Sequence, residues 1–132
     1  MVQTLMDAAV RAAEQAYVPY SNFPVGAALL ANDGTVVTGC NVENASYPLT
    51  NCAERVAIGT AVAGGIRTIQ AIAVYAPRVE TVTPCGACRQ VINEFKPEDD
   101  ELWMIFSSIA GPMLVPFSEL LPRAFGPRDL ED

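Results

Sequence analysis

The sequence predicts an α/β fold, in which a mixed five-stranded sheet has helices on both faces in a three-layer α/β/α arrangement. Three features predict it: a helical period at the start of the chain, a pair of strand-like runs around Asn32-Asp33-Gly34, and a later alternation of strand and helix patterns. A hairpin supplies antiparallel pairing and the alternation supplies parallel pairing. The sheet should therefore be mixed, with its helices divided between the two faces.

The first elements are a helix and a hairpin. Small and apolar residues recur at helical spacing over residues 4–17, Thr4 with Asp7 resembles a capping box, and Pro19 ends the element. Asp-Gly between apolar, partly β-branched runs is a strong hairpin signal, so we expect antiparallel strands over 23–31 and 35–41.

The remaining elements follow the same rules. Asn, Ser, Pro and Thr predict a loop over 43–51, and Gly64-Gly65 ends the helix that comes after it. We find no repeat, linker or low-complexity segment, so residues 1–132 are expected to form one domain. The expected elements are a helix over 52–63, a strand over 69–76, a connection over 78–84, a helix over 85–95, strands over 102–107 and 113–116 joined at Gly111-Pro112, and a helical turn over 118–121.

Charge and composition exclude some classes of partner. The chain has 8 Lys and Arg against 15 Asp and Glu, a net charge of -7, without a basic cluster, so we expect no nucleic acid partner and instead a small, neutral ligand. The 51% hydrophobic content is high for 132 residues and predicts a homo-oligomer. The first residues lack a basic start and an apolar run, so we expect no signal peptide, no membrane contact and a cytoplasmic location.

Four cysteines and no histidine restrict the possible chemistry. In a chain without an export signal, cysteines favour metal binding or thiol chemistry over structural disulfides. Cysteines and carboxylates must therefore supply any metal ligands and any general base.

Two short clusters carry the candidate chemistry, and each opens an expected helix. Cys85 and Cys88 are three residues apart, so on a helix their sulfurs share one face and can bind one ion. Cys52 can supply a third ligand, and zinc with three protein ligands keeps a fourth position for water, as in catalytic sites. The clusters are Cys52-Ala53-Glu54-Arg55 and Pro84-Cys85-Gly86-Ala87-Cys88-Arg89-Gln90.

Glu54 is the candidate general acid and base. In a regular helix, its side chain would point about 200° away from that of Cys52. The two converge if Cys52 stands at the very start of the helix, which is the arrangement we expect. Arg55, together with the two helix N-termini, can offset the negative charge of three thiolates from beside the ligands, whereas Arg89 is as readily a surface charge.

These residues match a known pattern. Zinc deaminases have a His or Cys ligand two residues before a catalytic Glu, and a later Pro-Cys-x-x-Cys. This chain resembles the small homotetrameric zinc-dependent cytidine deaminases over most of its length. Beyond the metal motifs, the resemblance includes Tyr20-Ser21-Asn22-Phe23-Pro24-Val25-Gly26-Ala27-Ala28, Gly39-Cys40-Asn41-Val42-Glu43-Asn44-Ala45-Ser46-Tyr47 and Leu120-Leu121-Pro122-Arg123-Ala124-Phe125.

The resemblance implies a nucleoside pocket shared between subunits of a homotetramer, with Zn²⁺ bound by Cys52, Cys85 and Cys88. Some of the pocket residues would come from the chain that binds the zinc. Others would reach in from a neighbouring subunit. The first group is Phe23 against the pyrimidine, Asn41 and Glu43 at the ribose hydroxyls and the main chain of Ala53 at the base; the second is Ala45, Tyr47 and Phe125.

The function that the resemblance implies is the hydrolytic deamination of free cytidine and deoxycytidine to uridine and deoxyuridine in pyrimidine salvage. Zinc-activated hydroxide would attack C4 while Glu54 transfers protons to N3 and to the departing ammonia. Several alternatives stay open: a closed structural zinc site completed by Cys40, a redox pair of Cys85 and Cys88, a non-enzymatic zinc module, and a deaminase of related aminopyrimidine nucleosides.

Overall fold

The computed structural model describes residues 1–131 and contains one five-stranded sheet in the order β2-β1-β3-β4-β5. β1 pairs antiparallel with both β2 and β3, β3 and β4 are parallel, and β4 and β5 are antiparallel. The predicted mixed sheet is therefore confirmed. The strands are β1 (Gly26–Ala31), β2 (Val36–Cys40), β3 (Ile69–Tyr75), β4 (Trp103–Phe106) and β5 (Met113–Pro116).

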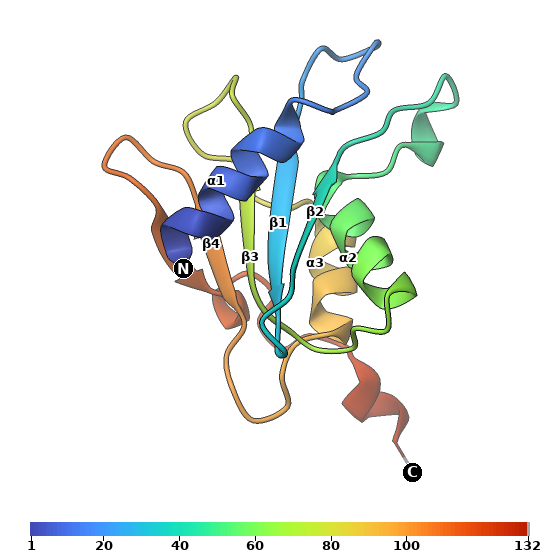
Figure 1. The fold of residues 1–132 in the computed structure, drawn as a ribbon. Helices are drawn as coiled ribbons and strands as arrows, with labels where there is room; N and C mark the ends of the chain where they lie inside the picture. The colour runs from blue at the N-terminus through green and yellow to red at the C-terminus, as the bar shows by residue number, and fades with distance from the viewer. Residues whose placement is uncertain (132) are drawn as a thin grey trace.

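Helices cover both faces of the sheet, which confirms the three layers (Figure 1). α1 (Val2–Ala13) lies on one face, and α2 (Ala53–Ala63) and α3 (Gly86–Glu94) lie on the other. Alternate residues of β3 pack into the cores on opposite faces of the sheet, because successive side chains of a strand point to opposite faces. Ile72 and Val74 belong to the α2 and α3 core, whereas Ala71 and Ala73 pack with α1.

Two glycines allow helices to approach the sheet closely. Gly26 and Gly39 stand on neighbouring strands, where Gly26 pairs with Cys40 and Ala27 pairs with Gly39. A Cβ at Gly39 would lie 2.5 Å from the main-chain N of Ala57 in α2, and a Cβ at Gly26 would lie 2.0 Å from the carbonyl O of Ala9 in α1. Each glycine therefore sets the distance of one helix from the sheet.

The first helix differs from the prediction at both ends. It begins at Val2 with Met1 as N-cap and no side-chain cap, so Thr4 lies inside the helix and makes no capping box. It ends at Ala13, not at residue 17. Tyr17 instead donates its main-chain N–H to the carbonyl of Asn41 (3.0 Å) and accepts from the N–H of Glu43 (2.9 Å). Long-range pairing of Tyr17 thus overrides its local helical preference.

Smaller differences occur in the loops. The first strand begins at Gly26 and not at residue 23, since Pro24 has no N–H for pairing. The loop over 43–51 contains a short 3₁₀ helix, η1 (Tyr47–Leu49), and the expected turn near 118–121 is η2 (Phe117–Glu119), with η3 (Pro127–Leu130) after it. The Asp33-Gly34 hairpin is present, with Gly34 at φ +89°. Among residues 1–131, none of the helices has both the length and the apolar composition needed to cross a membrane.

Candidate metal centre and active site

Two of the candidate ligands stand at helix N-caps. Cys52 caps α2 with extended backbone angles (φ -70°, ψ 153°), and Cys85 caps α3 in nearly the same conformation (φ -68°, ψ 170°). Cys88 follows one turn into α3 and is fully buried. The first N–H groups of both helices have no intrahelical partner, so the two helix ends bring partial positive charge to the same place.

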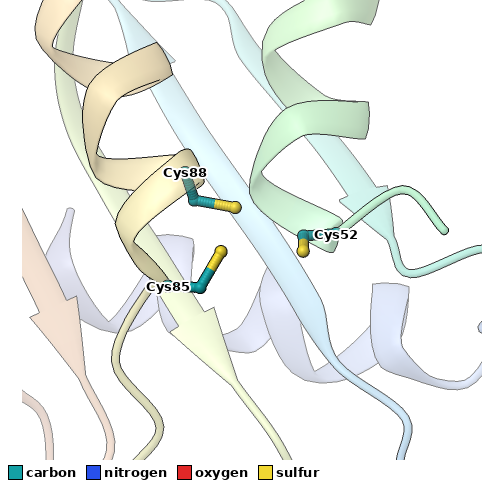
Figure 2. A group of neighbouring side chains, drawn as sticks. All are labelled: Cys52, Cys85 and Cys88. Atoms are coloured by element: carbon teal, nitrogen blue, oxygen red, sulfur yellow. The ribbon is translucent and has the colours of Figure 1, made fainter. Parts of the chain in front are cut away.

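The three sulfurs form one group. Those of Cys52, Cys85 and Cys88 all lie within 4.8 Å of one another. Figure 2 shows the Cys85 and Cys88 side chains extending from α3 toward Cys52 at the start of α2. Soft thiolate ligands in a compact group of three suit zinc. The donor set present in the chain therefore fits the Zn²⁺ cofactor.

Cys40 is not a member of this group within residues 1–131. It pairs with Gly26, and residues directly opposite in an antiparallel pair share a face of the sheet. Because a Cβ at Gly26 would meet α1, Cys40 belongs to the α1 face. The three-cysteine group lies at the N-termini of the helices on the other face, so the hypothesis of a site closed by Cys40 is not supported.

The surroundings of the sulfurs favour a thiolate at Cys52. The pKa of Cys52 is lowered to about 5, mainly by its hydrogen bond with Cys88 and further by the Arg55 guanidinium. The same hydrogen bond and burial raise the pKa of Cys88. Arg55 donates from Nη2 to Cys52 Sγ at 3.3 Å and to the Thr50 carbonyl at 3.4 Å. Arg55 thus lies directly beside a candidate ligand.

Glu54 lines a cavity next to these ligands. It is the second residue of α2, is only 4% exposed, and lines a cavity of about 170 Å³ together with Cys52 and Cys85. Burial raises the pKa of Glu54, and the negative charge of Cys52 adds to the rise. A carboxyl group shifted in this direction is suited to accept and return a proton near neutral pH.

A second hollow adjoins the first. It has a volume of about 220 Å³ and is lined by Glu43, Tyr20, Ser21, Tyr47 and Thr50. Thr50 lines both spaces, so the Glu54 cavity and the outer hollow are neighbours. A ligand with two linked parts could therefore occupy both.

The predicted ribose-facing residues hold the loop over 20–25. The Asn41 side chain accepts from the Val25 N–H (2.9 Å) and donates to the Phe23 carbonyl (2.9 Å). Glu43 accepts from the Ser21 hydroxyl and from two main-chain N–H groups, which lowers its pKa. Both side chains are thus held in fixed orientations, and Asn41 also lines the Glu54 cavity.

The other predicted site residues divide into two groups. Ala53 is buried and lines the Glu54 cavity, and Phe23 is half-buried in the loop that Asn41 holds. Ala45, Tyr47 and Phe125 are exposed, and Tyr47 packs edge-on against Tyr20 with 5.7 Å between ring centroids. Within residues 1–131, none of these three lines the cavity beside Glu54.

Sequence reasoning missed some of the cavity lining. Thr50 comes two residues before Cys52, Val82 and Thr83 come just before Pro84-Cys85, and Val25 precedes β1. Their positions offered one usable signal. Because both ligand motifs open helices, the segments that lead into the two N-caps lie near the same space, but which of their residues line it depends on how the segments meet.

Comparisons with known proteins agree with this geometry. A family model described as the cytidine and deoxycytidylate deaminase zinc-binding region matches residues 1–101. The cytidine deaminase of Sporosarcina psychrophila is 49% identical over 130 residues (98% of this chain, 94% of that protein), and that of Halalkalibacterium halodurans is 50% identical over 131 residues (98% of each). The crystal structure of cytidine deaminase from Burkholderia pseudomallei matches with a TM-score of 0.84 and 48% identity, covering 93% of this chain and 98% of that one. The chain belongs to the cytidine and deoxycytidylate deaminase zinc-binding family.

Proposed function

We propose that this chain catalyses the hydrolytic deamination of free cytidine and deoxycytidine, consuming water and releasing ammonia with uridine or deoxyuridine. One observation carries the proposal: the buried carboxyl group of Glu54 shares a cavity with Cys52 and Cys85 of the three-cysteine group. A closed structural zinc site would have no use for that carboxyl group or that space. The cytidine deaminase relatives, at about half identity over nearly the whole chain, support the same reaction.

In this proposal Cys52, Cys85 and Cys88 hold Zn²⁺. When bound with three protein ligands, zinc lowers the pKa of water to about 7 and so supplies a nucleophile. Arg55 and the N-termini of α2 and α3 offset the negative charge of the thiolates. The Arg55 contact also orients the Cys52 sulfur.

Glu54 moves the protons. It accepts one proton from the attacking water and delivers it to N3 of the pyrimidine. It then takes the remaining proton of the hydroxyl group now on C4 and delivers it to the 4-amino group, which leaves as ammonia. Its burial keeps the carboxyl group away from bulk water and raises its pKa, which favours uptake of a proton. Proton transfer is thereby confined to one side chain.

The two adjoining hollows fit the two parts of a nucleoside. We assign the pyrimidine to the cavity beside Glu54, where Ala53 is part of the lining. In the described part of the chain, Phe23 is not among the residues that line this cavity, and its place against the base is proposed from the resemblance to the family. The ribose then extends toward Glu43 and Asn41, whose fixed oxygens can accept from sugar hydroxyls. A free base lacks the sugar hydroxyls that would donate to these oxygens, so it should be a poorer substrate than the nucleoside.

We also propose a homotetramer that completes each pocket with Ala45, Tyr47 and Phe125 of a neighbouring copy. These three residues are exposed, and further large apolar side chains on the surface support burial between subunits.

The packing of the chain supports a single domain, because both hydrophobic cores pack on one sheet. The free thiols that must bind metal favour a reducing compartment, which for this chain we take to be the cytoplasm.

The test compares Glu54→Gln with the parent protein. We expect the variant to keep one zinc per chain and to lose about 10² to 10⁴-fold in kcat, because the amide cannot take up the proton of water. Ultraviolet monitoring of cytidine and deoxycytidine measures turnover, and atomic absorption measures zinc. Glu14→Gln, which makes the same charge change at an exposed residue after α1, is the control and should match the parent.

The competing functions give different results. A zinc-loaded parent that turns over no nucleoside would indicate a non-enzymatic zinc module. A parent that prefers another aminopyrimidine nucleoside over cytidine and deoxycytidine in a substrate panel would indicate a related deaminase.

A further inference from the structure

We propose that Gln90 and Asn93 are positioning residues that hold the main chain of Phe125 and thereby fix the direction of its ring. The proposal deepens the function proposed above and rests on it, since Phe125 is assigned there to the nucleoside site. Neither residue is a candidate metal ligand or lines the cavity beside Glu54.

Both side chains donate to a single main-chain acceptor. Gln90 Nε2 lies 2.8 Å from the Phe125 carbonyl oxygen, and Asn93 Nδ2 lies 3.2 Å from it. The two residues are three apart on α3 and so share one face of the helix. Two donors from one helix on one carbonyl fix that carbonyl more closely than either bond alone.

The burial of Asn93 supports a specific role. The side chain is 3% exposed, and its Oδ1 has no hydrogen-bond partner within residues 1–131. A buried amide with an unpaired oxygen is less favourable than an apolar side chain of similar size. The bond from Nδ2 to Phe125 is the interaction that an apolar residue could not provide.

The same helix holds the other end of the segment. Arg89 donates from Nη1 to the Leu120 carbonyl (2.9 Å) and from Nε to the Pro84 carbonyl (2.8 Å), just before the ligand Cys85. The chain from Leu120 to Phe125 is therefore anchored on α3 at both ends. Between the anchors, Arg123 has φ +54°, a conformation that a non-glycine residue keeps only where its surroundings hold it.

Gly126 shows how closely the segment lies against Asn93. A Cβ at Gly126 would be 2.7 Å from Asn93 Nδ2, so a glycine lets the main chain pass directly over the amide. The Phe125 side chain nevertheless stays 60% exposed. Its main chain is fixed while its ring faces outward, and such preorganisation favours binding to another surface.

The anchored ring faces away from the chain's own cavity. Phe125 is 60% exposed and, within residues 1–131, does not line the cavity beside Glu54. Its ring is therefore better placed to meet a second copy of the chain than to close its own cavity. The α3 helix would then carry ligands of one pocket at its start and position an aromatic side chain for another pocket near its end.

The main test is Gln90→Glu, which keeps the shape of an exposed side chain but removes its donor. We expect KM for cytidine to rise about threefold to tenfold, with kcat and zinc content unchanged, because the interaction contributes equally to substrate and transition state. Gln90→Lys restores an N–H donor and should bring KM back toward the parent value. Gln15→Glu makes the same charge change at an exposed residue outside this segment and should leave KM unchanged.

A double-mutant cycle tests whether the rise in KM of Gln90→Glu acts through Phe125. Phe125→Ala should raise KM by about tenfold, through loss of aromatic contact with the base. Gln90→Glu should then add nothing in the Phe125→Ala protein. An unchanged KM in Gln90→Glu alone, or an equal rise with and without Phe125, would overturn the proposal.

A second measurement does not depend on catalysis. Trypsin cleaves after Arg123 inside the anchored segment, and cleavage requires the segment to open. Gln90→Glu should speed this cleavage about threefold to tenfold. An unchanged rate overturns the anchoring itself, whereas faster cleavage in a protein that turns over no nucleoside supports the anchoring and rejects the proposed function.

Discussion

The metal centre and the outward-facing pocket residues are built in opposite ways. The centre comes from two helix N-termini packed on one sheet, and Cys88 and Glu54 are 0% and 4% exposed. Tyr47 begins the short 3₁₀ helix η1 and Phe125 lies between η2 and η3, and their side chains are 69% and 60% exposed. Figure 1 shows the segment with η1 projecting beyond the end of the sheet. Under the proposed function, the chemistry is contained in one chain, whereas these exposed residues act at the pocket of a second copy.

The strongest test of this contrast is Cys88→Ser in the buried centre. A hydroxyl group is a poor zinc ligand, so we expect loss of bound zinc and a fall in turnover of at least about 10³-fold. Atomic absorption and ultraviolet monitoring of cytidine measure the two quantities. Circular dichroism should still report a folded protein, since the sheet and its two cores do not depend on this one sulfur. A variant with full zinc and parental turnover would contradict the assignment of Cys88 as a ligand.

A smaller loss of turnover is expected when the packing of α2 on the sheet is disturbed and the metal ligands themselves are kept. Gly39→Ala puts a Cβ 2.5 Å from the N of Ala57 and 2.7 Å from the carbonyl O of Ala53, so α2 must move away from β2. We expect a loss of about 1–3 kcal/mol in unfolding free energy. Because α2 carries Cys52 and Glu54, kcat/KM should also fall by about 10²-fold, as expected for a displacement near 1 Å.

Gly26→Ala is the matched control for that displacement. Its Cβ would lie 2.0 Å from the Ala9 carbonyl, so the clash moves α1, which holds no candidate site residue. Denaturant unfolding should report a comparable loss of stability, while zinc content and kcat of the folded protein stay near the parent values. An equal fall in kcat for both variants would mean that the α2 position does not control the site.

The same contrast separates what the sequence could predict from what it could not. Helix starts at Cys52 and Cys85 are local features, so motif spacing was enough to predict the three-cysteine group. The end of α1 depends on main-chain bonds between Tyr17 and the distant residues Asn41 and Glu43, which no local pattern encodes. The lining by Thr50 and Thr83 likewise depends on how two extended segments meet in space.

The face occupied by Cys40 also could not be predicted from spacing, because strand register decides it. Its pairing with Gly26 directs it toward α1, and burial raises the pKa of the thiol, so Cys40 stays protonated.

We therefore expect Cys40→Ser to leave zinc content and kcat at the parent values. Its one consequence should be a stability loss of about 1 kcal/mol or less, measured by denaturant unfolding, from placing a hydroxyl group in a half-buried apolar position. Cys88→Ser makes the same chemical change at a candidate ligand. Any difference in zinc content between the two variants therefore comes from the position of the cysteine and not from the change of residue type. Loss of zinc in Cys40→Ser would require a fourth thiolate on the metal and would remove the vacant position on which hydrolysis depends.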